Sequence, residues 1–321
     1  MYLHVLNGDA TRMILEQTGI PGEMLVWADV LHDGPAPADA SGDRWRELRA
    51  RHLSHGNGDL DAVGEELRRA DERLDRYADY EEVVFWFEHD LFDQLLLIRH
   101  LRWLSTLPDR SRFRLICIGS FPGHPDFAGL GQLNPVELAS LFPGRQPLTD
   151  AQVALGSRLW LAFGAADPRP FSDLVMKGDS SELPFAAGAL VRQLEDFPSI
   201  EDGLARTERQ ILAAIRDGQQ TAMGVFKAAA RLEERVFMGD LTMWGWMERM
   251  TQGRAPLIAL DGGFHPGRMP SGTFTLTDAG RAVFDGRAYS IELNGIDRWM
   301  GGVHLTDGRY RWTGEELKLI R

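Results

Sequence analysis

Residues 83–101 decide the fold, and they read VVFWFEHDLFDQLLLIRHL. Apolar residues at 83–87 are followed by the polar triplet Glu88-His89-Asp90, and then by apolar positions at helical spacing as far as Trp103. A short continuous apolar run predicts a strand buried on both faces, and the spacing after it predicts an amphipathic helix. This stretch is therefore expected to form a strand–turn–helix unit of an α/β domain.

Similar apolar runs occupy residues 2–6, 23–27 and 115–118. Helical patterns or long connections separate the runs from one another, which predicts a mostly parallel sheet covered on both faces. We therefore predict a Rossmann-like α/β domain at residues 1–133.

Two features of this first domain are expected to lie outside the sheet. Gly34, Pro35 and Pro37 argue against regular structure at 34–37. A charged region at 44–75, interrupted near Gly56-Asn57-Gly58, has sparse apolar positions and is expected to form a surface helix or helix pair.

Strand patterns end near Asn134. Residues 134–198 are predicted to be a helical extension, and 198–203 an exposed linker that a protease cuts first. Residues 204–285 show the order of three helices followed by a hairpin, which predicts a winged-helix-like domain. Residues 286–321 are expected to form a C-terminal hairpin tail.

Composition and charge limit the class of protein. The chain has 321 residues, of which 44% are apolar and 26% charged, so it can bury sizeable cores and is neither disordered nor collagen-like. Its net charge of −12 opposes general nucleic-acid coating. A single cysteine, Cys117, excludes an intramolecular disulfide and is expected to be inert core. With no long apolar segment and no basic leader at the N-terminus, we expect a cytoplasmic protein with no membrane contact.

The third helix of the winged-helix-like region bears on DNA binding. Ten basic and nine acidic residues make residues 204–285 nearly neutral. The helix at 240–250 is rich in Trp and Met, whereas a DNA reader needs basic or amide side chains there. DNA binding is therefore not expected, although His265 and Arg268 could contact phosphate. The helix is better suited to packing on the neighbouring domain or on a protein partner.

Polar residues follow every predicted strand, and ligands of open parallel sheets bind at these carboxyl ends. We therefore predict one shared cleft for a small ligand, phosphorylated or metal-associated, with a divalent metal as a potential cofactor. The catalytic candidates are His89, Asp90 and Asp33. The ligand-binding candidates are Asn7, Gly8, Asp9, Asp29, His32, Gly119 and Ser120.

Several candidates have a purely structural alternative. Asp9 could cap the helix that follows it, and Asp90 with Asp93 resembles a capping box. The segment at 32–35 could be a simple turn. His89 lies between two carboxylates that could raise its pKa, which would suit a general acid or base or a metal ligand. The glycine-containing loops at 121–132 could form a lid or a plain connection.

Four motifs stand in order along the first part of the chain. They are LHVLNGD at 3–9, WADVLHDGP at 27–35, WFEHDLFDQL at 86–95 and ICIG at 116–119. With these motifs the chain resembles the bacterial Domain of Unknown Function family 1835, most clearly over the first 150 residues, and its later parts resemble the longer members. The resemblance implies a Rossmann-like first domain and carries no activity.

Two functional hypotheses follow. In the first, the strand ends bind a phosphorylated or metal-associated small molecule, as in a hydrolase or transferase, with His89 moving a proton and Asp9 and Asp90 holding a cation. In the second, the protein is a non-enzymatic regulator or adaptor that senses a ligand and uses the winged helix for contact with a protein or DNA.

Overall fold

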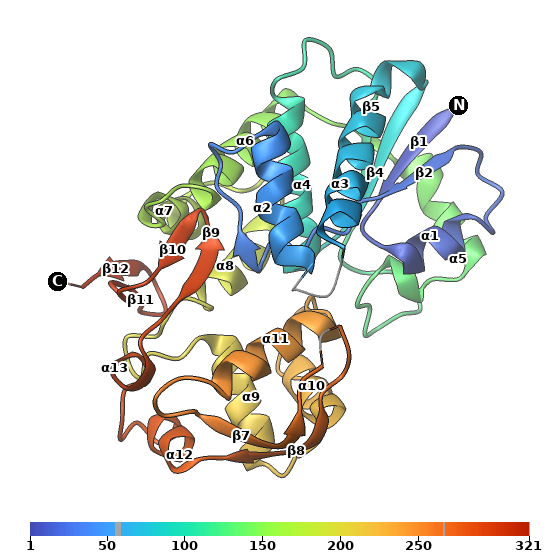
Figure 1. Ribbon diagram of the computed structural model, residues 1–321. Helices are drawn as coiled ribbons and strands as arrows, with labels where there is room; N and C mark the ends of the chain where they lie inside the picture. The colour runs from blue at the N-terminus through green and yellow to red at the C-terminus, as the bar shows by residue number, and fades with distance from the viewer. Residues whose placement is uncertain (55–58, 266, 321) are drawn as a thin grey trace.

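The computed structural model describes residues 1–54, 59–265 and 267–320. Its main element is a five-stranded sheet with the strand order β2-β1-β4-β5-β6 (Figure 1). The strands are β1 (Tyr2–Leu6), β2 (Glu23–Val26), β4 (Glu82–Glu88), β5 (Phe113–Ile118) and β6 (Gln146–Pro147). The fold is thus mixed α/β with a mostly parallel sheet.

The register confirms the predicted pairing of the four apolar runs. Val5 of β1 lies opposite Leu25 on one side and Phe85 on the other, and Phe85 lies opposite Leu115 of β5. All three of these pairings are parallel. The edge strand β6 runs antiparallel to β5 and falls where only helices were expected. Its Pro147 cannot donate a ladder hydrogen bond, so an edge position suits it.

Residues of β4 alternate between two hydrophobic clusters on opposite faces of the sheet. Phe85 and Phe87 belong to the larger cluster, and Val84 and Trp86 to the smaller one. This period of two is the geometry of an extended strand. The larger cluster is covered by α4 (Leu91–Leu104), α6 (Asp150–Phe163), α7 (Arg169–Lys177) and α8 (Ala186–Leu194); the smaller lies under α1 (Asp9–Leu15) and α5 (Pro135–Leu141).

The charged region after the second strand forms a helix pair. Helix α2 (Gly42–Ser54) packs on α3 (Leu60–Asp75) beside the sheet (Figure 1). The break expected at Gly56-Asn57-Gly58 lies outside the described residues.

The expectation that residues 34–37 have no regular structure is wrong. Gly34–Pro35 is a short strand, β3, which pairs in parallel with β9 (Arg298–Gly301). Strand β9 in turn pairs with β10 (Val303–Leu305). Gly34 has φ of +80°, a backbone conformation that suits glycine. A partner more than 260 residues away stabilises this strand, so local sequence could not indicate it.

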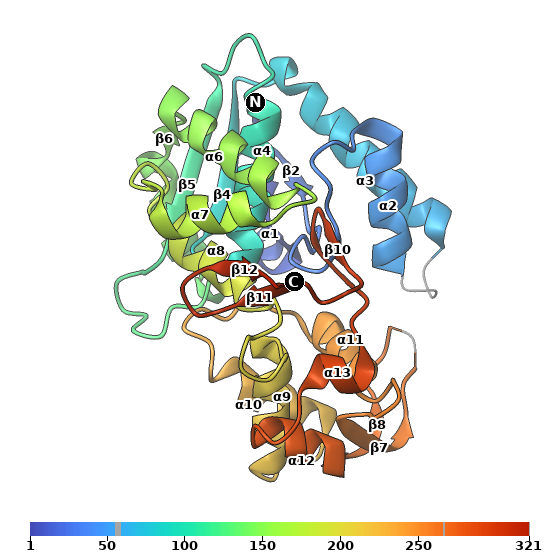
Figure 2. The same cartoon turned by 90° about the vertical axis from the view of Figure 1, so that its left-hand side faces the viewer.

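The C-terminal tail at 286–321 contains more elements than the one hairpin that the sequence predicted. It contains α13 (Ser290–Asn294), the β9–β10 hairpin, and a second hairpin of β11 (Tyr310–Trp312) and β12 (Leu317–Leu319). Figure 2 shows the second hairpin next to α7, which β12 contacts. The tail therefore returns to the first part of the chain.

The segment at 198–203 is only in part the exposed linker that the sequence predicted, since Ile200 and Glu201 are exposed but the C-terminal tail holds the backbone. Trp312 N donates to Pro198 O over 2.8 Å, and Ile200 N donates back to Trp312 O over 2.9 Å. The Tyr289 hydroxyl donates to Ser199 O, and Asp202 is buried. Because the tail covers this segment and uses its polar backbone groups, we do not expect preferential proteolysis here.

Residues 204–285, called here the C-terminal module, contain three helices followed by an antiparallel hairpin and a short helix. They are α9 (Arg206–Arg216), α10 (Ala222–Ala230), α11 (Asp240–Met250), β7 (Ile258–Gly263), β8 (Ser271–Leu276) and α12 (Asp278–Phe284). This is the element order expected from the sequence.

Helix α11 faces the sheet-containing part of the molecule (Figure 1). Trp246 on this helix is buried, and the side chains of Arg249 and Arg298 lie over its ring at 4.7 and 4.5 Å. Arg249 also lies 3.8 Å from the carboxylate of Asp33. The expectation that the Trp- and Met-rich helix packs on a neighbouring part of the chain is confirmed.

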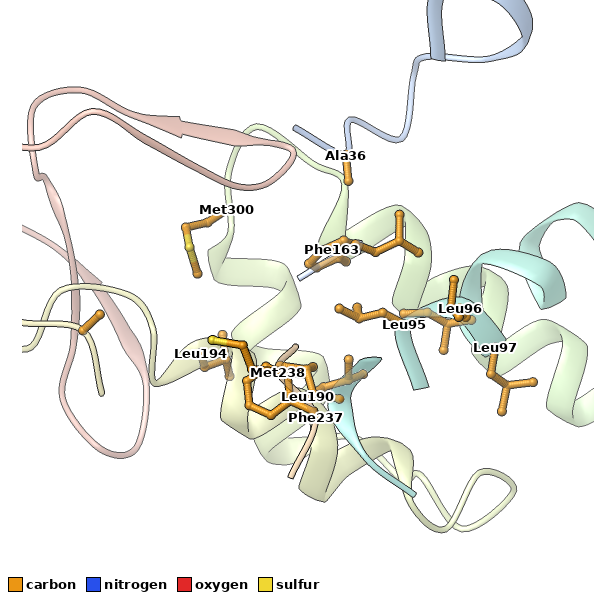
Figure 3. Packing of buried hydrophobic residues seen from close by; sticks show 14 of the residues in the cluster. Ala36, Leu95, Leu96, Leu97, Phe163, Leu190, Leu194, Phe237, Met238 and Met300 are labelled. Carbon is orange, nitrogen blue, oxygen red and sulfur yellow. The ribbon is translucent and has the colours of Figure 1, made fainter. Parts of the chain in front are cut away.

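The segment before α11 continues this junction. Figure 3 shows Phe237 and Met238 beside Leu190 and Leu194 of α8, and all four belong to the larger hydrophobic cluster. One continuous core therefore extends from the sheet into the C-terminal module. Among the described residues, no helix combines the length and apolar character that crossing a membrane requires.

Candidate functional site

The strand order changes direction between β1 and β4. From β1 the chain proceeds to β2 on one side, whereas from β4 it proceeds to β5 on the other. In open α/β sheets a crevice forms at such a reversal, because the connections after the two strands diverge to opposite faces. Asn7 follows β1 directly, and Glu88 ends β4. Both therefore lie at the point where the strand order reverses.

Three carboxylates gather at this point, and we call Glu88, Asp90 and Asp93 the carboxylate cluster. Each offers an oxygen atom within 4.8 Å of an oxygen of the other two. They are also buried, with exposed fractions of 5%, 5% and 1%. Among the described residues this is the only group of three or more such side chains with metal-ligand spacing.

Local structure explains why the three side chains meet. Asp90 is the N-cap of α4, and its carboxylate accepts a hydrogen bond from Asp93 N over 3.0 Å. The predicted cap is therefore confirmed for Asp90. The carboxylate of Asp93 instead accepts from Glu88 N over 3.0 Å, so the reciprocal bond of a capping box is replaced by a bond to the strand end.

Asn7 links the cluster to β1. Its Nδ2 donates to Glu88 Oε1 over 3.2 Å and to Asp93 Oδ2 over 2.9 Å. The hydroxyl of Thr11 donates to Asn7 Oδ1 over 3.2 Å, which fixes the orientation of the amide. Leu130 N supplies a further hydrogen bond to Glu88 Oε1, over 2.6 Å. The oxygens of the cluster are thus positioned by neutral donors.

Burial and mutual repulsion disfavour full ionisation of the cluster. Burial, and then the charge of Asp90, raise the pKa of Glu88 to about 7. Burial raises the pKa of Asp90 to about 6, and burial with the two neighbouring carboxylates raises the pKa of Asp93 well above its ordinary value. The cluster therefore retains protons near neutral pH unless a cation compensates its charge.

The loop after β5 crosses the strand ends and covers part of the site. A Cβ built on Gly129 would overlap Glu88 Oε2, so any other residue here would displace the carboxylate of Glu88. Phe127 stacks on the ring of His89 with a centroid distance of 6.2 Å. The loop that the sequence left open as a lid or a plain connection thus contacts the candidate site directly.

His89 lies beside the cluster in a largely apolar environment. Its ring packs between Phe127 and Phe185, and its Nδ1 has no hydrogen-bond partner among the described residues. Burial and the charge of Arg235 lower its pKa. The expectation that Glu88 or Asp90 raises this pKa is therefore wrong, and His89 is neutral at pH 7.

Arg235 is a site residue that the sequence did not reveal. It belongs to the segment between α10 and α11, and its Nη1 donates to His89 O over 3.0 Å and to Phe185 O over 3.3 Å. No local pattern distinguishes it from the other arginines of the C-terminal module, because only tertiary folding brings it to β4.

The candidate residues predicted at the end of β1 have different roles in the structure. Asn7 joins the cluster, and Gly8 is the N-cap of α1. Asp9 is the first residue of α1 and makes no capping hydrogen bond, so the expectation that it caps the helix is wrong. Its exposed carboxylate accepts from Arg12 Nε over 2.9 Å.

The candidate residues that follow β2 are buried in contacts between different parts of the molecule. Asp29 is fully buried in an ion pair with Arg49 at 2.7 Å. His32 is buried between Phe92 and Phe237, and burial lowers its pKa to about 4.

Asp33 belongs to the same junction. Burial raises its pKa, but Arg249 and His52 outweigh this effect and lower it overall. Asp29, His32 and Asp33 are thus held by contacts within this junction. Asp29 also lines a pocket of about 570 Å³ together with Asp9, which follows β1.

The candidate residues that follow β5 contribute less to the candidate site. Gly119 lies against His89, since a Cβ at position 119 would come within 3.2 Å of His89 Cβ. Ser120 is exposed. Cys117 lies next to Glu88 O at 3.5 Å, and burial raises the pKa of its thiol to about 12, which disfavours the reactive thiolate.

Glu88 and Asp93 are the members that sequence reasoning left out of the candidate list. A signal was present for both. Because side chains alternate along β4, Glu88 lies on the same face of the sheet as Trp86. Asp93 stands three residues after Asp90 in the first turn of α4. Neither a family model nor a curated protein matches this chain.

Proposed function

We propose that the carboxylate cluster binds a divalent cation, and that the protein uses this cation to hold and act on a small phosphorylated ligand as a hydrolase or transferase. The observation that carries the proposal is the convergence of three buried carboxylates within 4.8 Å where the strand order reverses. Mg²⁺, Mn²⁺ and Ca²⁺ prefer oxygen ligands of this kind.

The electrostatics of the cluster support a cation. Three like charges are buried at short range, and their pKa values are raised accordingly. A bound cation would neutralise them and displace the protons they retain at neutral pH. When bound, such a cation polarises a phosphoryl oxygen as a Lewis acid.

We expect Asp90→Asn to weaken Mn²⁺ binding at least about tenfold, because a charged ligand is lost while asparagine still caps α4. The measurement is isothermal titration calorimetry of the full chain at pH 7.5. Asp59→Asn is the matched control, since Asp59 caps α3 through Asp61 N and Ala62 N and is exposed. Equal Mn²⁺ affinity in wild type and Asp90→Asn, or no Mn²⁺ binding by wild type, would overturn the proposal.

His89 is proposed as the group that moves a proton, acting as a base because its lowered pKa leaves it neutral at pH 7. We expect His89→Asn to keep Mn²⁺ affinity within about twofold, since His89 is not among the three ligands. Calorimetry with Mn²⁺ checks this. A large loss of affinity in a folded His89→Asn protein would instead make His89 a ligand of the cation.

The second candidate function, a ligand-sensing regulator, is favoured by one observation. Arg235 and Phe237 connect the C-terminal module to the strand end and to His32. We propose that the module is winged-helix-like and that its third helix serves contact with the rest of the chain or with protein rather than DNA. Kinship with family 1835 and a Rossmann-like first domain are part of the same proposal.

The buried state of α11 leads to an expectation for DNA. Its exposed residues are Asp240, Leu241 and Glu248, none of which is basic. We therefore expect no binding of random duplex DNA tighter than about 1 μM at physiological salt. Fluorescence anisotropy at several salt concentrations checks this, and tight binding with a steep salt dependence would show that the module reads DNA.

A further inference from the structure

We propose that Arg235 binds the phosphate group of the ligand in the cavity between α8 and the segment that precedes α11. The inference rests on the proposed function, because it assigns the anionic end of that same ligand to a residue of the C-terminal module. If Arg235 does not bind phosphate, the cluster can still bind a cation, and the experiment below distinguishes these two results.

The cavity has a volume of about 350 Å³ and lies beside the N-terminus of α4. A volume of this size suits a small phosphorylated molecule. Its lining includes Leu91 from α4, Gly188 from α8, and three arginines, which are Arg192, Arg206 and Arg235.

Two of the three arginines are already neutralised by carboxylates. Arg192 pairs with Glu233 at 2.8 Å and with Asp196 at 3.0 Å. Arg206 pairs with Glu195 and Glu234, both at 2.7 Å. These two side chains therefore hold the junction together and have little charge left for a ligand.

Arg235 differs from both of them. Among the described residues it has no carboxylate within 4.0 Å, and its hydrogen bonds go only to the carbonyl oxygens of His89 and Phe185. Both bonds use Nη1, so Nη2 and Nε donate to no described residue. An anchored guanidinium with free donors can bind a phosphate through two parallel hydrogen bonds.

Gly188 leaves the guanidinium accessible from α8. A Cβ at this position would lie 3.2 Å from Arg235 Nη1 and 3.4 Å from Nη2. A side chain there would crowd Nη1 and touch Nη2, whereas glycine leaves the space beside them to the cavity.

Arg235 and the carboxylate cluster flank the same turn of the chain. Its hydrogen-bond partner, His89 O, belongs to the residue between Glu88 and Asp90. An anion bound by Arg235 would therefore lie near the turn that carries the cluster, where a cation on the cluster would also attract it.

The experiment measures binding of inorganic phosphate to the full-length protein by calorimetry, with and without saturating Mn²⁺. We expect Arg235→Gln to weaken phosphate binding at least about tenfold, and Arg235→Lys, which keeps the charge without the planar fork, to weaken it less. Mn²⁺ affinity without phosphate should stay within about twofold in both variants. Arg231→Gln is the matched control, since Arg231 is exposed and makes no ion pair with a described residue.

The outcomes separate the two proposals. Equal phosphate affinity in wild type and a folded Arg235 variant would overturn this inference, as would the absence of phosphate binding by a wild type that binds Mn²⁺. Equal competition by acetate would also overturn the choice of phosphate. Phosphate binding that needs Arg235 while Mn²⁺ does not bind would support the inference and remove the cation from the proposed function. If Arg235→Gln fails to fold by circular dichroism, Arg235→Lys decides the same question.

Discussion

Glu88→Gln is expected to be more stable than the wild type in the absence of divalent cations, by an amount that grows from pH 5 to pH 8. Glutamine keeps an oxygen to accept the hydrogen bonds from Asn7 and Leu130 but carries no charge. At pH 5 Glu88 is protonated in the folded protein, so the two proteins should differ little. At pH 8 the wild type must bury a charge that the variant lacks.

The direction of this change in stability with pH follows from proton linkage. The pKa of Glu88 is raised from 4.5 to about 7 in the folded protein, so between these values the folded state holds more protons than the unfolded chain. The stabilising contribution is fully present below pH 4.5 and is lost as the pH rises through 7. The raised pKa corresponds to on the order of 3 kcal/mol, which is the upper limit of the difference at pH 8.

The comparison must be made as a difference between two proteins, because buried histidines titrate in part of the same range. His32 and His100 have lowered pKa values, so they reduce stability as the pH falls below 6.5. Both proteins share this effect, and it cancels in the difference.

Urea denaturation with chelator at pH 5, 6, 7 and 8 measures the effect. Glu315→Gln is the control, because Glu315 is exposed and lies in no described ion pair. A difference between Glu88→Gln and wild type that does not change with pH would contradict the electrostatic description of the cluster. Saturating Mn²⁺ should reverse the order of stability at pH 8, since a cation stabilises only the protein that binds it.

Arg49→Met is expected to lower the free energy of unfolding by about 3–5 kcal/mol. Arg49 is fully buried, and its guanidinium donates to Asp29 Oδ1 over 2.7 and 2.9 Å. It also donates to the carbonyl oxygens of Val30, Asp33 and Pro35. Methionine fills much of the volume but leaves a buried carboxylate and three carbonyl groups without their donor.

Denaturation in urea at pH 7 tests this prediction. Arg51→Met on the same helix is the matched control, because the Arg51–Glu47 pair is exposed and should contribute less than about 1 kcal/mol. In the double variant Asp29→Leu/Arg49→Met, stability should partly recover, since no charge is left buried alone. A loss below about 1 kcal/mol for Arg49→Met would show that the ion pair does not organise residues 29–35.

The Arg49→Met experiment would also show what Asp29 does in the folded protein. From sequence, Asp29 is a ligand candidate because it follows a strand. Its carboxylate is committed to Arg49, so substitution at either position should change stability rather than ligand binding. His32 and Asp33 contribute to the junction with the C-terminal module for the same reason.

Several features of this protein follow from the sequence alone. The apolar runs determine the parallel strands, because a strand buried on both faces needs side chains that are apolar at successive positions. The triplet after residue 87 indicates a polar strand end, and Asp90 indicates the start of α4. The Trp- and Met-rich character of residues 240–250 indicates a helix that buries much of its surface. Each of these signals is local, since it lies within one element or at its boundary.

Only the tertiary structure decides which polar strand ends form the candidate site. Asn7 and Glu88 are 81 residues apart, and they meet because β1 and β4 are neighbours in the sheet. Asp29 leaves the candidate set because Arg49 reaches it from α2, and Arg235 enters because the C-terminal module folds back onto β4. The charge and hydrogen-bonding capacity of each side chain are fixed by its residue type. Its partner is fixed by packing between distant segments, and that partner determines whether a carboxylate is neutralised, protonated or free to bind a cation.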